Sequence, residues 1–307
     1  MPSNHNRYKP VYHLHRMNSE TKKILVPIGF SDQSIIALDQ AAMFAKPIHA
    51  EIVMLSVIDN NNTVFTKLFS SNEKLNELKK EIGQKLEQEA AAFSNKHGLK
   101  TTTMVAVGQV YDEIARVADL LKVELVVMGT NGKPNNFKKR FIGSNAFRVV
   151  SLVEPPVVTV KGVDIRQEIN TIVLPLVLER SSREKVGKAL TYARLFNAKI
   201  RVVAVAKTKE EHKKLAPSLV QVGTFIRDAG VECSADMILA ENKKVHESIF
   251  DYRKAHDGDL IIITEDGDDF KLGLGTTEVE KIIYGAEVPV MSITPSHTKF
   301  QNQFDTW

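Results

Sequence analysis

The sequence has one cysteine and no long apolar run, and both absences narrow the kinds of protein it can be. Cys233 is the single cysteine among 307 residues, so no disulfide can form within the chain, as is typical of proteins from reducing compartments. No apolar run approaches the roughly 20 residues that span a bilayer, and the first residues lack the apolar core of a signal peptide. We therefore expect a cytoplasmic protein.

An excess of charge of one sign is also missing. The chain has 41 Lys and Arg residues against 37 Asp and Glu residues, which gives a net charge of +4, and the two signs are interspersed. This balance indicates neither nucleic acid nor a membrane surface as a partner. The hydrophobic fraction of 43% is ordinary for a globular protein, and the length suggests about two domains.

Motifs of the common enzyme classes are absent as well. The sequence contains no GxxxxGK[ST] phosphate loop, no nucleophile elbow and no HExxH. Cys233 lies in VECSADMIL, a predicted strand, which favours a small buried residue over a nucleophile. No spacing that suggests a shared metal connects His97, His212, His246 and His256. We therefore expect a protein that is not an enzyme.

What the sequence does contain is one unit that appears twice. Residues 23–57 align without a gap with residues 171–205 at an offset of 148, which pairs Pro27 with Pro175. Two later pairs of segments also match: ELVVMG at 124–129 with DLIIIT at 259–264, and EPPVVTV at 154–160 with EVPVMSI at 287–293. Such a repeat predicts two copies of the same structure. We expect a disordered leader at 1–19, a first domain at 20–163, a second domain at 168–296 and a C-terminal tail at 297–307.

Within each copy, short β-branched runs alternate with longer stretches of helical periodicity, which predicts a doubly wound parallel sheet. The strands expected in the first copy are KILVPI, AEIVMLSVI, TTTMVAV, LVVMGT and PPVVTVK. The helices expected there cover 33–45, 73–97, 111–122 and 145–152. We predict an α/β fold of two tandem five-stranded parallel sheets with helices on both faces. The last strands, 156–161 and 289–294, are expected to pair the copies as a pseudo-dimer, since each edge would otherwise be open.

Ligands of open parallel sheets bind beyond the carboxyl ends of the strands, near the point where strand order reverses. In the first copy this edge receives VVMGTNGKPNNFKKRFIGSNAF, residues 126–147. Gly129 and Gly132 allow close backbone approach to a ligand. Gly143 and Ser144 precede a predicted helix, whose N-terminus favours an anion. The same residues could instead turn the chain and cap the helix, and the residues alone leave both interpretations open.

These features together resemble the universal stress protein family in its tandem form. The resemblance covers about residues 20–295 and rests on the opening ILVP and IVLP strands, on VVMGTNG, on GSNA and on the closing PPVVTVK. It implies an adenine-nucleotide α-hydrolase-like fold and, in the ATP-binding branch of the family, ATP with Mg²⁺ as the ligand. In that branch the backbone at Val57 would contact adenine, and Met128 and Gly129 would lie near the ribose and phosphates. The remaining implied site residues, at the phosphates, are Gly132, Gly143, Ser144 and Asn145.

The first copy departs from the family pattern at two places. The segment between Gly132 and Gly143 has ten residues, where the pattern has nine, and Gly29 stands where the first strand of ATP-binding members usually ends in Asp. Losing one hydrogen bond from a charged group costs about 1.5–3 kcal/mol, or roughly one to two decades of affinity. Asp32 could substitute for that acid, or it could cap the helix expected from Gln33.

The second copy departs further. Val177 replaces the acid, Thr264 replaces the first glycine, and only seven residues separate Gly267 from Gly275. The loop also gathers four carboxylates, which would repel a triphosphate unless a divalent cation intervenes: Glu265, Asp266, Asp268 and Asp269. We therefore predict a stress-response regulatory module with weak ATP binding in the first domain and none in the second. The alternatives are a nucleotide-independent scaffold for an unidentified protein partner and a slow ATPase, with pairing inside the chain or as a homodimer.

Overall fold

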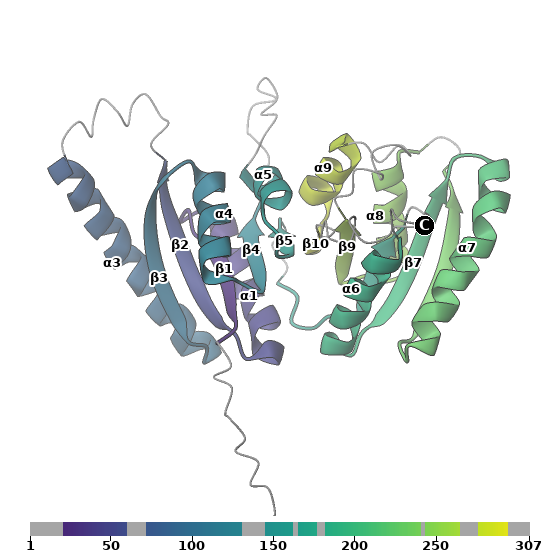
Figure 1. The fold of residues 1–307 in the computed structure, drawn as a ribbon, viewed down its shortest axis with the longest axis horizontal. Coiled ribbons are helices and arrows are strands. Elements are labelled where there is room, and N and C mark those ends of the chain that lie inside the picture. Colours follow the sequence, from purple (N-terminus) through teal and green to yellow (C-terminus); the bar gives the residue numbers. More distant parts are fainter. Residues whose placement is uncertain are drawn as a thin grey trace, which may run out of the picture.

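The computed structural model describes residues 21–59, 72–130, 145–161, 165–176, 182–240, 243–264 and 276–293. Strands and helices alternate through both halves of the chain (Figure 1). The first half runs β1 (Lys23–Pro27), α1 (Asp32–Ile48), β2 (Glu51–Asp59), α3 (Asn72–His97), β3 (Thr101–Gly108), α4 (Val110–Leu121), β4 (Leu125–Gly129), α5 (Asn145–Leu152) and β5 (Val157–Val160). The second half runs β6 (Thr171–Pro175), α6 (Ser182–Phe196), β7 (Lys199–Ala206), α7 (Lys209–Asp228), β8 (Cys233–Leu239), α8 (Val245–Ala255), β9 (Leu260–Thr264), α9 (Thr276–Gly285) and β10 (Val290–Ile293).

The strands form one sheet in the order β3-β2-β1-β4-β5-β10-β9-β6-β7-β8. Neighbouring strands within each half are parallel, and the halves join through the antiparallel pair β5 and β10, in which Val158 lies opposite Met291. The predicted fold class is confirmed, including the pairing of the two last strands. The second half repeats the strand order of the first, so the sheet is pseudo-symmetric about the β5–β10 seam.

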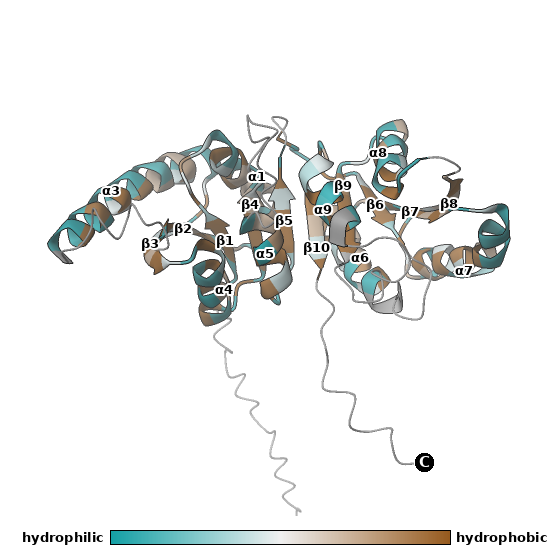
Figure 2. Ribbon diagram, turned by 90° about the horizontal axis from the view of Figure 1, so that it is seen from above, coloured by the Kyte–Doolittle hydropathy of each residue, from teal (hydrophilic) through white to brown (hydrophobic). Residues whose placement is uncertain are grey.

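Apolar side chains cover both faces of this sheet, because successive residues of a strand point to opposite faces. On β1, Ile24 and Val26 belong to the layer beneath α1 and α3, whereas Leu25 belongs to the layer beneath α4 and α5. Figure 2 shows the apolar strands enclosed between helices whose outer faces are polar. Burial on both faces explains why the strands read as nearly continuous apolar runs rather than alternating ones.

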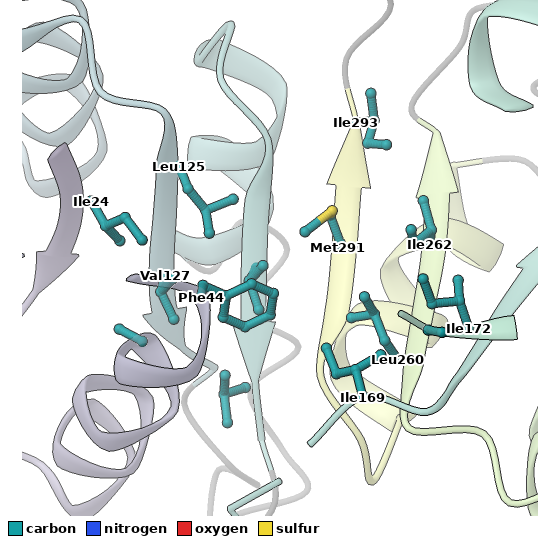
Figure 3. Packing of buried hydrophobic residues seen from close by; sticks show 14 of the residues in the cluster. Ile24, Phe44, Leu125, Val127, Ile169, Ile172, Leu260, Ile262, Met291 and Ile293 are labelled. Carbon is teal, nitrogen blue, oxygen red and sulfur yellow. The ribbon is translucent and has the colours of Figure 1, made fainter. Parts of the chain in front are cut away.

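The core continues across the seam between the halves. One layer of buried side chains includes Phe44 of α1 and Val127 of β4 together with Met291 and Ile293 of β10 (Figure 3). On the other face α5 and α9 lie beside each other, and the N–H of Phe147 donates to the hydroxyl of Tyr284 at 3.2 Å (Figure 1). The two halves therefore share one core.

The long helix α3 uses one stripe of its surface to cover the sheet. Leu86 and Phe93 are buried in the layer that also contains Ile52 of β2. These two side chains hold α3 against the sheet. None of the helices in the described ranges combines the length and the apolar character needed to cross a bilayer.

Candidate functional site

The reversal of strand order in the first half lies between β1 and β4, and a cleft opens there. The cleft has a volume of ≈ 270 Å³ and lies at the carboxyl ends of β1, β2 and β4. Its lining residues come from these strand ends and from the first turns of three helices: Pro27, Ile28, Gly29, Ser31, Ser34, Leu55, Val57, Val110, Ile114, Met128, Gly129, Asn145 and Ala146. The cleft therefore lies where an open α/β sheet binds its ligands.

Four of the seven residues expected at the site line this cleft. Val57 comes from β2, Met128 and Gly129 end β4, and Asn145 begins α5. The other three expected residues lie outside the described part of the chain: Gly132, Gly143 and Ser144. Residues more than 80 positions apart in the sequence thus meet at one place, because parallel strands bring their carboxyl ends to the same edge.

The backbone of Val57 faces the cleft for a reason that follows from strand register. The N–H of Ile28 donates to the carbonyl oxygen of Leu55 at 2.8 Å, so the backbone groups of Leu55 point towards β1. Residues two apart on a strand point the same way, so those of Val57 do too. β1 ends at Pro27, which leaves the backbone N–H and C=O of Val57 turned towards the cleft rather than towards a neighbouring strand.

Three helices begin at the cleft, and their N-termini make it favourable for an anion. Ser31 caps α1, since its side chain accepts from the N–H of Ser34 at 3.3 Å. Gln109 precedes α4, but its side chain accepts no hydrogen bond from the N–H groups of the first turn. No charged side chain is among the lining residues that the structure describes. The first turns of α1 and α4 carry Asp32, Asp112 and Glu113, but none of these side chains lines the cleft, so the helix N-termini that face it still favour a phosphate or another anion.

Two expectations about this edge need correction or narrowing. Asp32 was expected either to replace the missing acid or to cap a helix that begins at Gln33; the helix begins at Asp32 itself, and Ser31 caps it. Gly129 has a packing role, because a Cβ there would lie 2.6 Å from the backbone oxygen of Gln33. A contact that short forbids any larger residue while α1 keeps its place, so the glycine is required whether or not a ligand binds.

Gly29 differs from Gly129, because a Cβ built on it meets no atom within 4 Å. The residue lines the cleft directly after β1. A larger side chain, including a carboxylate, therefore fits at this position without displacing the protein around it. The next residue, Phe30, has a left-handed backbone with φ of 56°, and the Lys85 ammonium lies 4.3 Å from the centre of its ring.

The corresponding place in the second half is occupied by a cluster of hydrogen-bonded side chains. The aligned segments place His246 of α8 at the position of Tyr111 and Glu278 of α9 at the position of Asn145. The Nδ1 atom of His246 lies 2.6 Å from the Oε2 atom of Glu278, and the backbone N–H of His246 donates to the same oxygen at 3.1 Å. The ammonium of Lys281 donates to the other carboxylate oxygen at 2.8 Å.

The ionisation of Glu278 reflects these partners. Burial opposes the charged form, but the hydrogen bonds from Lys281 and His246 outweigh it and lower the pKa of Glu278 to about 2. A carboxylate thus stays ionised between the first turns of α8 and α9, where the first half has the neutral Asn145. A second anion at this place would be repelled.

Sequence reasoning missed the cluster of His246, Glu278 and Lys281, and it also missed Ser31, Ser34, Val110 and Ile114 in the cleft lining. The repeat carried a usable signal, since aligning the copies puts a glutamate at the position of Asn145 in the candidate site and a histidine next to the position of Val110. The other departures expected in the second half, at Val177 and in the acidic loop 265–275, lie outside the described residues. Among the described residues no group of three His, Cys, Asp or Glu side chains could hold a metal ion.

The sequence favoured a buried Cys233, but in the structure this residue is only half-buried. Its thiol donates to the backbone oxygen of Ser234 at 3.3 Å. Burial raises the pKa of the thiol above its ordinary value. A raised pKa lowers the fraction of thiolate, which is the reactive form.

Comparisons with known proteins agree with this architecture. A family model described as the universal stress protein family matches residues 20–161. Universal stress protein MJ0531 of Methanocaldococcus jannaschii is 34% identical over 140 residues, which are 46% of this chain and 82% of that protein. Universal stress protein MJ0577 of the same organism is 31% identical over 157 residues, 46% of this chain and 94% of that protein.

A solved structure matches most of the chain. A universal stress protein from Archaeoglobus fulgidus aligns with 89% of this chain and 96% of its own, with a TM-score of 0.65 and 19% sequence identity. At that identity the likeness shows the fold alone. Because it extends over 89% of this chain, it includes residues of both halves.

Proposed function

Since this chain belongs to the universal stress protein family, we propose that its first half binds an adenine nucleotide weakly and that its second half binds none. The observation that carries the proposal is the cleft at the reversal point of the first half, lined by Val57, Met128, Gly129 and Asn145. The role we infer is that of a regulatory module in a stress response. The two units would extend over residues 20–163 and 168–296.

The size and lining of the cleft favour the nucleoside part of the ligand. A volume of ≈ 270 Å³ is at the lower limit of small-ligand pockets, which are about 300–1,000 Å³. Apolar side chains such as Leu55 and Ile114 would contact the base, and the backbone of Val57 offers it a donor and an acceptor. The phosphates of ATP, with Mg²⁺, would extend past Gly129 and the first turns of α1 and α5, whose N–H groups favour negative charge.

The absence of an acid at Gly29 supports a weak site rather than a tight one. The described lining has polar atoms from Ser31, Ser34 and Asn145 but no carboxylate to bind the ribose hydroxyls. One missing charge-assisted hydrogen bond costs about 1.5–3 kcal/mol. We therefore expect binding at tens to hundreds of micromolar where a complete site would bind at about one micromolar.

The experiment that tests the proposal is calorimetric titration of the whole chain with ATP and Mg²⁺, with native mass spectrometry of freshly purified protein beside it. We expect one site per chain by calorimetry and one bound nucleotide in native spectra recorded with added ATP, because a ligand bound this weakly leaves the protein during purification. Absence of heat at millimolar ATP would overturn the proposal and leave a nucleotide-independent scaffold. Two sites per chain would contradict the assignment of the second half. Release of phosphate on prolonged incubation would point to the slow ATPase.

A further inference from the structure

The segment that follows β5 is held in a groove between the two halves. Gln40 of α1 is fully buried; its Oε1 accepts from the N–H of Arg166 at 2.8 Å and its Nε2 donates to the Arg166 carbonyl oxygen at 3.0 Å. The guanidinium of Arg166 pairs with Asp259 at 3.2 Å. Ile169 is 2% exposed and belongs to the core. This part of the chain is therefore a built element of the interface, not a loose tether.

The pseudo-symmetry of the sheet creates a second groove of the same kind. β1 pairs with β4 through Ile24 and Leu125, and β6 pairs with β9 through Ile172 and Leu260, which are the aligned positions of the repeat. In these alignments Lys188 corresponds to Gln40, and Glu124 corresponds to Asp259. The backbone agrees, because the N–H of Glu124 donates to the carbonyl of Lys23 at 2.9 Å and that of Asp259 donates to the carbonyl of Thr171 at 2.8 Å.

A cavity of ≈ 750 Å³ lies at this second groove. Its lining includes both counterpart residues, Lys188 and Glu124, together with Leu152, Pro155 and Ile293. Leu152 is 52% exposed, so part of its apolar side chain is available to a segment that covers the cavity. Where the first groove holds residues 165–170, the described residues leave the second one open.

The end of β10 points to an occupant from this same chain. Ile293 is the last described residue and lies at the end of β10 (Figure 3). It corresponds to Val160, the residue after which the chain enters the first groove. Continuing the alignment of β5 with β10 places Lys299 at the position of Arg166. The partners correspond as well, since Arg166 pairs with Asp259 and Glu124 occupies the Asp259 position. Within the described residues Glu124 forms no ion pair.

We propose that the segment after Ile293, which lies outside the described residues, docks in the ≈ 750 Å³ cavity as residues 165–170 dock in its counterpart, with Lys299 paired to Glu124. The docked segment covers Leu152 and Pro155 and passes Lys188. It ties the end of the second half to the amino ends of β4 and β5 in the first half. The interface between the halves then has two chain segments across it, one on each side of the pseudo-symmetry axis.

A charge exchange tests this pairing. We compare wild type, Glu124→Lys, Lys299→Glu and the double variant by the rate at which chymotrypsin cleaves after Phe300, followed by the mass of the released peptide. Cleavage follows the population of undocked segment when docking is fast. Each single variant is expected to be cleaved about two to five times faster, the range for one partly exposed ion pair. The double variant should return to the wild-type rate.

Two further measurements keep the outcome decisive. Glu232→Lys makes the same charge change at an exposed position far from the cavity and should leave the cleavage rate unaltered. Trp307 is the only tryptophan, so acrylamide quenching of its emission reports on the same segment and should rise in the single variants. Equal cleavage rates in all four proteins would overturn the proposal. A loss of self-association in Glu124→Lys without faster cleavage would also overturn it and assign the cavity to a second copy.

Discussion

The carboxyl-edge cleft of the first half and its counterpart in the second half lie at the same point of the strand order, yet the first has no charged side chain in its described lining and the second holds a hydrogen-bonded cluster of His246, Glu278 and Lys281. The difference lies at two aligned positions, where Tyr111 and Asn145 in the first half become His246 and Glu278 in the second. Backbone topology therefore provides the place for a ligand in both halves. The side chains at the helix N-termini set the charge of that place, which is neutral in the described lining of the first half and includes the ionised Glu278 in the second.

The comparison also separates two uses of a helix N-terminus. In the first half the N-termini of α1, α4 and α5 border the cleft with no charged side chain in its described lining. In the second half the first turn of α9 carries Glu278, an acidic residue that complements its own helix dipole. The first turns of α1 and α4 also carry acidic residues, but these do not line the cleft, so the difference lies in whether a carboxylate points into the site.

The largest effect is expected when Gly129, which lets β4 approach α1 closely, is replaced by threonine, the residue at the aligned position 264. Gly129→Thr puts a Cβ 2.6 Å from the Gln33 backbone oxygen, so strand and helix must separate. We expect a loss of unfolding free energy of about 3 kcal/mol, measured by urea denaturation. Gly29→Ala is the control, because a Cβ at Gly29 meets no atom within 4 Å, and it should change stability little. Equal effects at the two glycines would contradict the packing role of Gly129.

The second prediction restores the missing acid. If the cleft binds an adenine nucleotide, Gly29→Asp should tighten ATP binding by about 1.5–3 kcal/mol, because a carboxylate at the end of β1 can accept from the ribose hydroxyls. Calorimetry measures the change. Gly29→Leu has a side chain of similar size without the acceptor and should weaken binding. Identical affinities for the two variants would remove Gly29 from the site.

The third prediction concerns Glu278 and its hydrogen-bonded partners in the second half. Glu278→Gln removes the charge that Lys281 and His246 stabilise, and we expect a loss of about 1–2 kcal/mol at neutral pH, reduced because Lys281 is partly exposed. Urea denaturation of both proteins across pH measures it. Tighter or additional ATP binding by this variant would indicate that Glu278 keeps the second half closed.

The pH dependence of that effect has a definite sign. The pKa of Glu278 in the folded protein, about 2, is below the 4.5 of an unperturbed glutamate, so its contribution to stability is complete above pH 4.5. It is lost as pH falls from 4.5 towards 2. The stability difference between wild type and Glu278→Gln should therefore be constant near neutrality and narrow over that acidic interval. A difference that stays unchanged down to pH 3 would contradict the lowered pKa.

The smallest effect is expected at the cap of α1. Ser31→Ala removes the acceptor for the N–H of Ser34 and should lower the unfolding free energy by about 1 kcal/mol. Ser31→Asp keeps an acceptor and should retain stability, and its negative charge at the cleft should weaken binding of an anionic ligand. Asp32→Asn serves as the control, since Asp32 lies inside the helix and not at its cap.

Patterns along the sequence predicted the repeated unit, the alternation of strands and helices and the pairing of the two last strands. These depend on periodicity among near neighbours and on the need to pair exposed strand edges, both of which can be read along the chain. The places of Val57, Met128, Gly129 and Asn145 at one cleft were also predictable, because they follow from which strand ends lie beside the reversal point.

Only the tertiary structure decided how individual side chains meet. Three features depend on the distances between packed elements. They are the capping of α1 by Ser31 rather than Asp32, the close approach of β4 to α1 at Gly129, and the contact of His246 with Glu278, which lies 32 residues away in the sequence. Such distances are set by strand register and helix packing together. No local pattern of residues encodes them, which is why two copies with the same periodicity differ at this edge: one has an uncharged described lining, and the other has an ionised glutamate bound by His246 and Lys281.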